Sequence, residues 1–573
     1  MAKLKINHID VTVPDGTTIL NAAKAYHINI PTLCYYPDLN IKSDCRICVV
    51  EIVGQKGLVT SCSTVVKDGM EIKTNSPRTL NARKTIVEMI LANHDASCTA
   101  CVRNMRCELQ KLANTLGIDE NRFENILSVQ PIDDNNPAIV RNPNRCIKCG
   151  RCIDVCKNIQ GVSVLDTMGR GHDADIVPAY HATLDQTDCT YCGQCSSVCP
   201  VGAITEKDHT HKVWDALHDE SKHVIVQAAP AVRVSLGDEL DMAHGSIVTG
   251  KLVAALKMLG FSRVFDTNFT ADLTIIEEGN ELIHRIAHGG SLPMITSCCP
   301  GWINYAERHY PEIIDHLSTC KSPQQMFGAL AKTYYAKREN IDPKNIYVVS
   351  IMPCTAKKYE AEREEMTVNG MDPDVDAVLT TRELAKMIKQ MGIHFDTLKE
   401  EKFDRPDEYT SGAAAIFGAT GGVMEAALRT VSEVLNGQPL EKIDFESVRG
   451  LDYYKEAEVM IKGEPIRVAV VHTLNHAKKI CEDILHQRSP YAFIEVMACP
   501  GGCIGGGGQP FGTTKEVRLD RSHAIYQVDR LSKFRKSHEN SAISTLYSQF
   551  LGEPYGELSH KLLHTHYRNL KSS

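Results

Sequence analysis

The chain has 573 residues, of which 43% are apolar and 23% charged, and its formal net charge is -8. This length predicts several domains, and so small a charge argues against a general nucleic-acid binder. No run reaches the roughly 18 apolar residues of a membrane span, and the N-terminus has no apolar signal core. We therefore expect a soluble, cytoplasmic protein that acts on neither membranes nor nucleic acid.

Cysteine is the unusual part of the composition. The chain has 22 cysteines, and most fall in tight groups separated by long stretches without any. Grouped cysteines in a long chain without an export signal indicate metal binding rather than disulfides.

Residues 1–78 are predicted to form a small β-rich domain. Two alternating runs around Asn7-His8 predict a hairpin, and Thr17-Thr18 offer an N-cap candidate for a short helix over 19–26. Four cysteines follow with the spacing C-x10-C-x2-C-x13-C, the general plan of a plant-type 2Fe–2S site. Zinc is the alternative, which the flanking β-grasp pattern disfavours. The candidate ligands are Cys34, Cys45, Cys48 and Cys62.

Residues 79–125 are predicted to be a small helical domain. Apolar residues recur every three or four positions over 80–91. One histidine and three cysteines follow, and imidazole in place of one thiolate changes the charge and potential of a cluster. We expect a 4Fe–4S site held by His94, Cys98, Cys101 and Cys107.

Residues 126–209 contain the most specific motif, a C-x2-C-x2-C-x3-C run that occurs twice. In bacterial two-cluster ferredoxins the fourth cysteine of each run binds the other cluster. The two predicted 4Fe–4S sets are Cys146, Cys149, Cys152 with Cys199, and Cys189, Cys192, Cys195 with Cys156. The insertion 157–188 is expected to cover a cluster edge or a docking face. The first 209 residues therefore predict an electron relay of four clusters.

Residues 210–573 predict a larger α/β domain. Buried-strand patterns at 223–229, 346–351, 466–471 and 493–497 are separated by helical patterns such as 250–259 and 381–391. Cysteines or glycines follow several of the predicted strands, where sites in α/β folds usually form. After the last strand, Cys499 and Cys503 precede a run of four glycines. Thiolates beside bare backbone predict an embedded cluster larger than a zinc site.

Three motifs of this domain identify the chain's resemblance to a known family. They are Thr296-Ser-Cys298-Cys299-Pro-Gly-Trp302, Met352-Pro-Cys354-x2-Lys357 and Glu495-Val-Met-Ala-Cys499-x3-Cys503. They resemble the three signature motifs of iron–iron (FeFe) hydrogenases. The upstream sites are similar to those of the larger members, and the first two also to respiratory complex I. The resemblance implies the reversible reaction 2H⁺ + 2e⁻ ⇌ H₂ at an H-cluster, a 4Fe–4S cluster bridged to a two-iron subcluster with CO, cyanide and azadithiolate.

The resemblance also implies roles for individual residues. Cys299, Cys354, Cys499 and Cys503 would bind the 4Fe–4S half, with Cys503 bridging to the two-iron subcluster. Lys357 would hydrogen-bond a cyanide, and the pocket would be lined by Ala229, Pro230, Gln324, Met352, Phe417 and Met497. Cys298 would relay protons along a path through Glu278, Ser318, Glu281 and Arg285.

Some of these assignments have a simpler alternative. Positions 278 and 281 share a helix face, which suits a relay, but an isolated carboxylate there would be read as a solvated face. Cys320 and Cys481 have no predicted role and are expected to be ordinary thiols. The histidines of the C-terminal tail form either a weak metal site or, as we expect, part of a solvated terminal helix; they are His560, His564 and His566.

One departure from the family concerns electron partners. Ala231 stands where ferredoxin-linked clostridial members typically carry serine, which is more typical of catalytic subunits of NAD(P)-linked, often electron-bifurcating, hydrogenases. We expect ferredoxin, a flavin/NAD(P)-binding subunit and a small iron–sulfur subunit as partners. The alternatives are a stand-alone ferredoxin-linked hydrogenase, a non-catalytic electron-transfer subunit and a hydrogenase-like assembly protein. The intact Cys298, Lys357 and proton-path residues argue against the last two.

Overall fold

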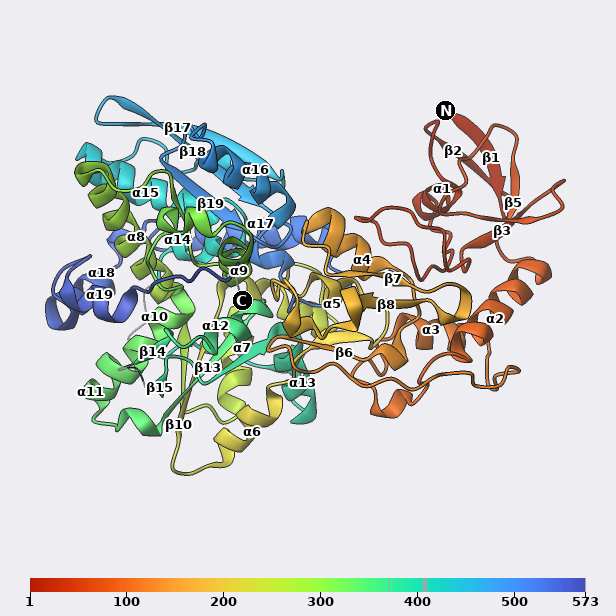
Figure 1. Cartoon of the computed structure of the whole chain (residues 1–573), viewed down its shortest axis with the longest axis horizontal. Helices are drawn as coiled ribbons and strands as arrows, with labels where there is room; N and C mark the ends of the chain where they lie inside the picture. The colour runs from red at the N-terminus through yellow and green to blue at the C-terminus, as the bar shows by residue number, and fades with distance from the viewer. Residues whose placement is uncertain (369, 371, 405–409, 572–573) are drawn as a thin grey trace.

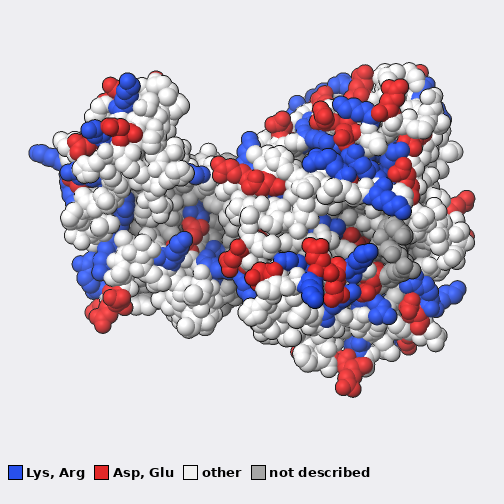
Figure 2. All heavy atoms as spheres, turned by 180° about the vertical axis from the view of Figure 1, so that it is seen from behind, with Lys and Arg blue, Asp and Glu red and all other residues white. Residues whose placement is uncertain are grey.

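The computed structural model describes residues 1–368, 370, 372–404 and 410–571. Figure 1 shows the chain running from an N-terminal lobe, through a helical and loop-rich middle region, to a larger body. Figure 2 shows this arrangement from behind, with a narrow waist between lobe and body and charges of both signs interspersed on the visible face. Among the described helices, none has both the length and the apolar character that crossing a membrane requires.

The N-terminal lobe is built on one mixed sheet of five strands in the order β2-β1-β5-β3-β4. Its strands are β1 (Ala2–Ile6), β2 (Ile9–Val13), β3 (Val49–Ile52), β4 (Leu58–Thr60) and β5 (Glu71–Lys73). The predicted hairpin is β1–β2, and the predicted helix is α1 (Ile19–Ala25), whose N-cap is Thr18. The buried side chains of this sheet and helix form one apolar core.

The middle region begins with two helices, α2 (Pro77–Leu91) and α3 (Glu108–Thr115). The repeated cysteine run then gives two short helices of matching geometry, α4 (Arg151–Asp154) and α5 (Gln194–Val198). Each starts after a glycine at φ 69°, Gly150 or Gly193, a conformation that glycine adopts without strain. The strands β6 (Ile139–Arg141) and β9 (Ile204–Glu206) pair and join the two repeats. The same sequence pattern thus produces the same local backbone twice.

The insertion 157–188 forms an antiparallel hairpin, β7 (Leu165–Met168) and β8 (Asp175–Pro178). Leu165 and Ile176 are buried in the same core as Cys152 and Cys199. The hairpin therefore packs against a core that contains one cysteine of each run, and its covering of a cluster edge or a docking face stays a prediction.

The body contains two four-stranded sheets. The first is fully parallel, in the order β11 (Arg263–Asp266), β10 (His223–Ala228), β13 (Ile346–Met352) and β16 (Ala377–Thr380). The second runs β12 (Met294–Ile295), β19 (Phe493–Met497), β18 (Glu464–His472) and β17 (Tyr454–Ile461), with only β17 antiparallel. Parallel strands are buried on both faces, which explains their nearly unbroken apolar runs. The predicted strands and the helices α7 (Thr249–Met258) and α13 (Thr381–Gln390) are confirmed.

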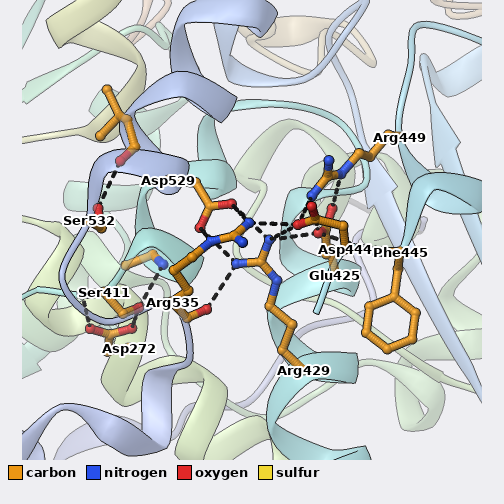
Figure 3. A network of polar contacts seen from close by, with 12 residues as sticks. Asp272, Ser411, Glu425, Arg429, Asp444, Phe445, Arg449, Asp529, Ser532 and Arg535 are labelled. Atoms are coloured by element: carbon orange, nitrogen blue, oxygen red, sulfur yellow. Dashed lines mark hydrogen bonds and ion pairs between the residues drawn. The ribbon is translucent and has the colours of Figure 1, made fainter. Parts of the chain in front are cut away.

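A long helix, α8 (Asn268–His288), crosses the body and is mostly buried. The C-terminal segment adds α17 (Lys515–Leu531), α18 (Ser541–Leu546) and α19 (Glu557–Leu563). Figure 3 shows a network of ion pairs between α15 (Gly422–Asn436) and this segment. Arg429, fully buried, lies 2.7 Å from Glu425 and 2.8 Å from Asp529, which are also fully buried. These charges attach the C-terminal segment to the rest of the body.

The expected solvated terminal helix is wrong. Leu562 and Leu563 of α19 are buried in a core that α8 also enters. His560 and His566 are exposed, but His564 is buried and contacts Thr319 and Glu277. The apolar residues of the tail pack into this core, so the segment is not solvated on all sides.

Candidate active site

The carboxyl ends of strands from both sheets converge on one cavity of about 80 Å³. Ala229 follows β10 and Cys354 follows β13, while Cys298 and Cys499 follow β12 and β19 of the other sheet. The structure brings together all the predicted pocket residues at this cavity. Its lining includes Ala229, Pro230, Cys298, Cys299, Gln324, Met352, Cys354, Lys357, Phe417, Met497, Cys499 and Cys503.

The four predicted ligand thiols of the body surround this cavity. Burial, and then the neighbouring Cys299, raises the pKa of the Cys354 thiol to about 12. Burial, and then the charges of Cys354 and Cys299, raise the pKa of Cys499 well above its usual value. Burial and the charges of the same two neighbours also raise the pKa of Cys503. Such thiols ionise readily only when a metal takes the place of the proton. Four of them around one cavity form a donor set suited to an iron–sulfur cluster.

The glycines on both sides of Cys503 have two functions in the structure. Gly502 and Gly506 line the cavity. A Cβ on Gly507 would lie only 2.2 Å from the carbonyl oxygen of Cys192, so glycine is required where this loop meets the second repeated cysteine run. Cys192 is also close enough to Cys499 for its charge to raise the pKa of that thiol. The last predicted accessory site therefore adjoins the cavity.

Lys357 is held by a buried acid. Its Nζ donates to the Cys298 carbonyl oxygen over 3.0 Å and forms an ion pair with Glu360 at 2.8 Å. Burial lowers the pKa of Lys357, but the charge and hydrogen bond of Glu360 outweigh it and raise that pKa. Glu360 also accepts from Gln324 Nε2 over 3.1 Å, whereas the Gln324 Oε1 atom is buried and has no protein partner in the described part of the chain. The ammonium group and a free amide oxygen are thus fixed beside the cavity.

The predicted proton-path residues lie in the expected order. Burial, and then Glu278, raises the pKa of Cys298 well above its usual value, so this thiol stays protonated. Burial and the charge of Glu281 raise the pKa of Glu278 to about 8, although a hydrogen bond from Ser318 opposes the rise. Ser318 Oγ donates to Glu281 over 3.0 Å, and Arg285 lies 2.6 Å from Glu281. The side chain of Arg285, at the far end of this path, is 11% exposed.

The candidate ligands of the N-terminal lobe lie in two close pairs. The Cys34 amide donates to Cys45 Sγ over 3.4 Å, and the sulfur atoms of Cys48 and Cys62 are 3.4 Å apart. Ser43 lies 3.5 Å from Cys62 Sγ and belongs to the loop that the long first gap of the motif provides. Cys34 and Cys45 lie on the loop before β3, while Cys48 and Cys62 lie next to the ends of β3 and β4. Two such pairs of thiols suit a two-iron cluster.

The middle region brings the crossed cysteine sets together. One small cavity is lined by Cys146, Cys149, Cys152 and Cys199. Burial and the charges of Cys192, Cys189 and Cys156 raise the pKa of Cys195. The four cysteines of the second set therefore lie close together. In the helical part, His94 is buried and its Nδ1 has no partner among the described residues, while Cys107 lies close enough to Cys101 to respond to its charge.

Several residues at the cavity were not among the predicted ones. Thr267, Ala271 and Pro323 line it, and Glu360 fixes both Lys357 and Gln324. Only Glu360 had a usable signal, since it stands three positions after Lys357 on α12 (Ala356–Ala361). The other three come from segments whose approach to the cavity depends on the tertiary fold.

Family models match nearly the whole chain. The model of the iron only hydrogenase large subunit, C-terminal domain, matches residues 222–507, and that of the iron hydrogenase small subunit matches 515–570. A 2Fe-2S iron-sulfur cluster binding domain matches 1–77. The NADH-ubiquinone oxidoreductase-G iron-sulfur binding region matches 83–122, and the ferredoxin-like domain of NADH-quinone oxidoreductase subunit 3 matches 136–205.

Individual proteins extend this similarity to full length. The chain is 48% identical to the NADP-reducing hydrogenase subunit HndD of Solidesulfovibrio fructosivorans, over 99% of both chains. It is 41% identical to iron hydrogenase 1 of Clostridium pasteurianum, over 99% of this chain and 100% of the other. A solved variant of the [FeFe]-hydrogenase HydA1 of Chlamydomonas reinhardtii is 42% identical, with a TM-score of 0.58 over 63% of this chain and 99% of that one. The chain belongs to the iron–iron hydrogenases, oxidoreductases that act on H₂, and carries N-terminal iron–sulfur domains for electron relay.

Proposed function

We propose that this hydrogenase is the hydrogen-activating subunit of a cytoplasmic NAD(P)-linked complex, with a flavin-containing partner subunit and a small iron–sulfur subunit. The observation that carries this proposal is the 48% identity along the entire length of a subunit named NADP-reducing. The sequence itself offers no flavin or dinucleotide motif, so electrons would reach NAD(P) through a partner. Ferredoxin is proposed as a second carrier, and Ala231 at the cavity supports the NAD(P)-linked class.

The residues around the cavity fit an H-cluster. Four thiols that line the cavity supply the ligands, Gly502 and Gly506 leave room for a bulky group, and the Gln324 Oε1 atom has no protein partner in the described chain. We propose Cys299, Cys354, Cys499 and Cys503 as the ligands, with Cys503 as the bridging one. When bound, this group would supply the redox chemistry that interconverts two protons and two electrons with H₂.

The protein's own contribution is to place protons and exclude water. The Lys357 ammonium, oriented by Glu360, provides a charge-assisted donor at the cavity, which is lined mainly by apolar groups such as Met352, Phe417 and Met497. Cys298 holds a proton at its sulfur beside the cavity. Glu278, with a pKa of about 8, can supply that proton and accept it back near neutral pH.

We further propose four accessory clusters, one 2Fe–2S and three 4Fe–4S. They would lie within residues 1–78, 79–125 and 126–209, and the catalytic domain would span 210–573. The ligand sets are those predicted from the sequence, and two kinds of observation support them. The crossed cysteines line one cavity, and the buried His94 Nδ1 is without a partner in the described residues.

Two experiments test these proposals separately. Infrared spectroscopy of the matured protein should show CO and cyanide bands, and a spectrum without them would rule out the H-cluster. For the partner, the purified chain with H₂ should reduce a viologen dye at once, but NAD(P)⁺ only after the flavin-containing fraction of the native complex is added. Reduction of ferredoxin at full rate by a chain that never co-purifies with flavin would favour the stand-alone enzyme instead.

A further inference from the structure

Three buried side chains of metal-binding type meet next to the proposed proton path. They are Glu281 on α8, Cys320 and His564, and their ligand atoms all lie within 4.8 Å of one another. Cys320 Sγ is 3.7 Å from Glu281 Oε2 and 4.0 Å from His564 Nδ1. A tetrahedron around a single ion with bonds of about 2.0–2.3 Å has edges of roughly 3.3–3.8 Å, so small shifts of these side chains would bring all three onto one ion.

The histidine has the support that metal-binding histidines usually have. Its Nε2 lies 3.2 Å from the carboxylate of Glu277, which fixes the ring and directs Nδ1 toward Cys320. Glu277 also accepts from the hydroxyl of Tyr547 and from the Tyr555 amide at 2.8 Å. Burial raises the pKa of Glu277, but its bonds from His564 and Tyr547 outweigh this and lower it, so the carboxylate stays charged. A carboxylate behind the ligating imidazole increases metal affinity.

The ligand-type atoms of the three residues face each other. Arg285 pairs with Glu281 Oε1 over 2.6 Å, while Oε2 accepts from Ser318 Oγ and the Thr319 amide, each over 3.0 Å, and faces Cys320. His564 Nδ1 contacts the Thr319 hydroxyl over 2.7 Å, a bond that the hydroxyl can exchange for another acceptor when an ion arrives. Cys320 is fully buried, and it belongs neither to the proposed cluster ligands nor to the proposed proton path.

Exposed imidazoles lead from the surface to this group. The His284 and His288 rings stack at 4.3 Å, and Tyr555 lies 5.1 Å from His284 and 4.3 Å from His560. The His560 ring is in turn 4.3 Å from that of His564. This row of imidazoles would offer a divalent ion a series of weak binding sites between the surface and His564.

We propose that Glu281, Cys320 and His564 form a binding site for a divalent ion of the zinc class, and that occupancy of this site slows hydrogen turnover. Binding would displace the Cys320 thiol proton to solvent, give three protein ligands of oxygen, sulfur and nitrogen type, and leave the fourth position to water. An ion on Oε2 would take Glu281 away from Ser318, and proton transfer along the path would stop there. The inhibitory part rests on the proposed function, whereas the binding part does not.

The test uses the full-length holoenzyme with one equivalent of Zn²⁺. Zinc absorption-edge spectroscopy should show one sulfur at about 2.3 Å together with nitrogen or oxygen at about 2.0–2.1 Å. Turnover should fall and return when a chelator is added, while the infrared bands stay unchanged. A shell without sulfur would place the ion on the exposed histidines and overturn the site. A sulfur-containing shell with full turnover would overturn the inhibition alone.

Matched variants separate this site from the other thiols. Cys320→Ser and His564→Gln should each raise the Zn²⁺ concentration needed for half inhibition by more than tenfold, and Glu277→Gln by about 10–100-fold. Cys481→Ser is the control, because Cys481 is equally buried and also lies outside the proposed clusters. Equal zinc sensitivity of Cys320→Ser and Cys481→Ser would overturn the proposal, and His564→Gln gives the same answer if Cys320→Ser fails to fold.

Discussion

The N-terminal 209 residues and the body build their thiol sites in different ways. In the N-terminal part, most ligands of one site lie within a single short segment, and a repeated run even repeats its backbone geometry at Gly150 and Gly193. In the body, the four thiols come from three separate segments and meet only because strands of two sheets end at the same cavity. The first kind of site depends on local spacing and the second on the whole fold. Damage to the body should therefore affect hydrogen chemistry while leaving the accessory sites intact.

The largest effect should come from removing the proposed proton donor. Cys298→Ala should lower H₂ evolution by about 10²–10⁴-fold, the range for loss of a positioned acid–base group. The paramagnetic signals of the reduced accessory clusters should not change, because Cys298 is no ligand in either region. Gas chromatography measures the rate of H₂ evolution, and paramagnetic resonance spectra of the same sample check that the accessory clusters are unchanged. Substantial remaining turnover would contradict the role of Cys298.

The next effect tests how strongly the body depends on distant contacts. Arg429→Ala takes their shared partner from the buried Glu425 and Asp529, which keep only Arg449 and Arg535, and should destabilise the body by at most about 3–5 kcal/mol. The two tryptophans, Trp214 and Trp302, both lie in the body, so their fluorescence on urea unfolding reports on this region alone. The exposed pair Lys442–Glu446 provides the control, and Lys442→Ala should change little. Similar midpoints for the two variants would argue against the network.

A smaller effect is expected where the two regions touch. Gly507→Ala puts a Cβ 2.2 Å from the Cys192 carbonyl, and overpacking of this kind costs about 1–3 kcal/mol. Because the contact lies between the last accessory site and the cavity, electron transfer from the body to the accessory clusters should slow. Stopped-flow reduction of the accessory clusters by H₂ measures this step. Gly57→Ala, where a Cβ would meet nothing within 4 Å, should behave as the parent.

The pH dependence sharpens the assignment of Glu278. Its pKa, raised from 4.5 to about 8, means that it carries a proton below pH 8 and loses it above. H₂ evolution needs the protonated form, so its rate should fall about tenfold per pH unit above 8. The remaining activity of Glu278→Gln should lack this inflection. The free energy of unfolding should change with pH in the same direction. Between pH 4.5 and 8 the folded state binds more protons than the unfolded state, so the free energy of unfolding falls as pH rises through that window.

The smallest effect concerns the cavity wall itself. Ala231→Ser adds one hydroxyl to a fully buried position at the cavity, next to Gly418. We expect a shift of a cyanide infrared band and little change in turnover, since one neutral hydrogen bond contributes about 0.5–1.5 kcal/mol. Unchanged bands would show that Ala231 does not face the cyanide group.

This difference between regions also explains what the sequence could predict. The ligand spacings of the N-terminal part and the strands predicted at 223–229 and 346–351 followed from local pattern alone. The family resemblance supplied the pocket residues, which no spacing connects. Neither source indicated Thr267 or Ala271 at the cavity, nor the burial of His564. Their positions depend on how α8 and the C-terminal tail pack, which is a property of the assembled core.

The ion pairs of Figure 3 bear on how the enzyme assembles. They join α15 to residues 515–535, and the segment 515–570 matches a family named for a separate small subunit. If this segment came away, the fully buried Arg429 and Asp529 would lose each other as partners, and Glu425 and Arg535 would remain beside them. In a continuous chain the segment is tethered at high effective concentration, so closing the interface needs no encounter between two proteins and does not depend on protein concentration.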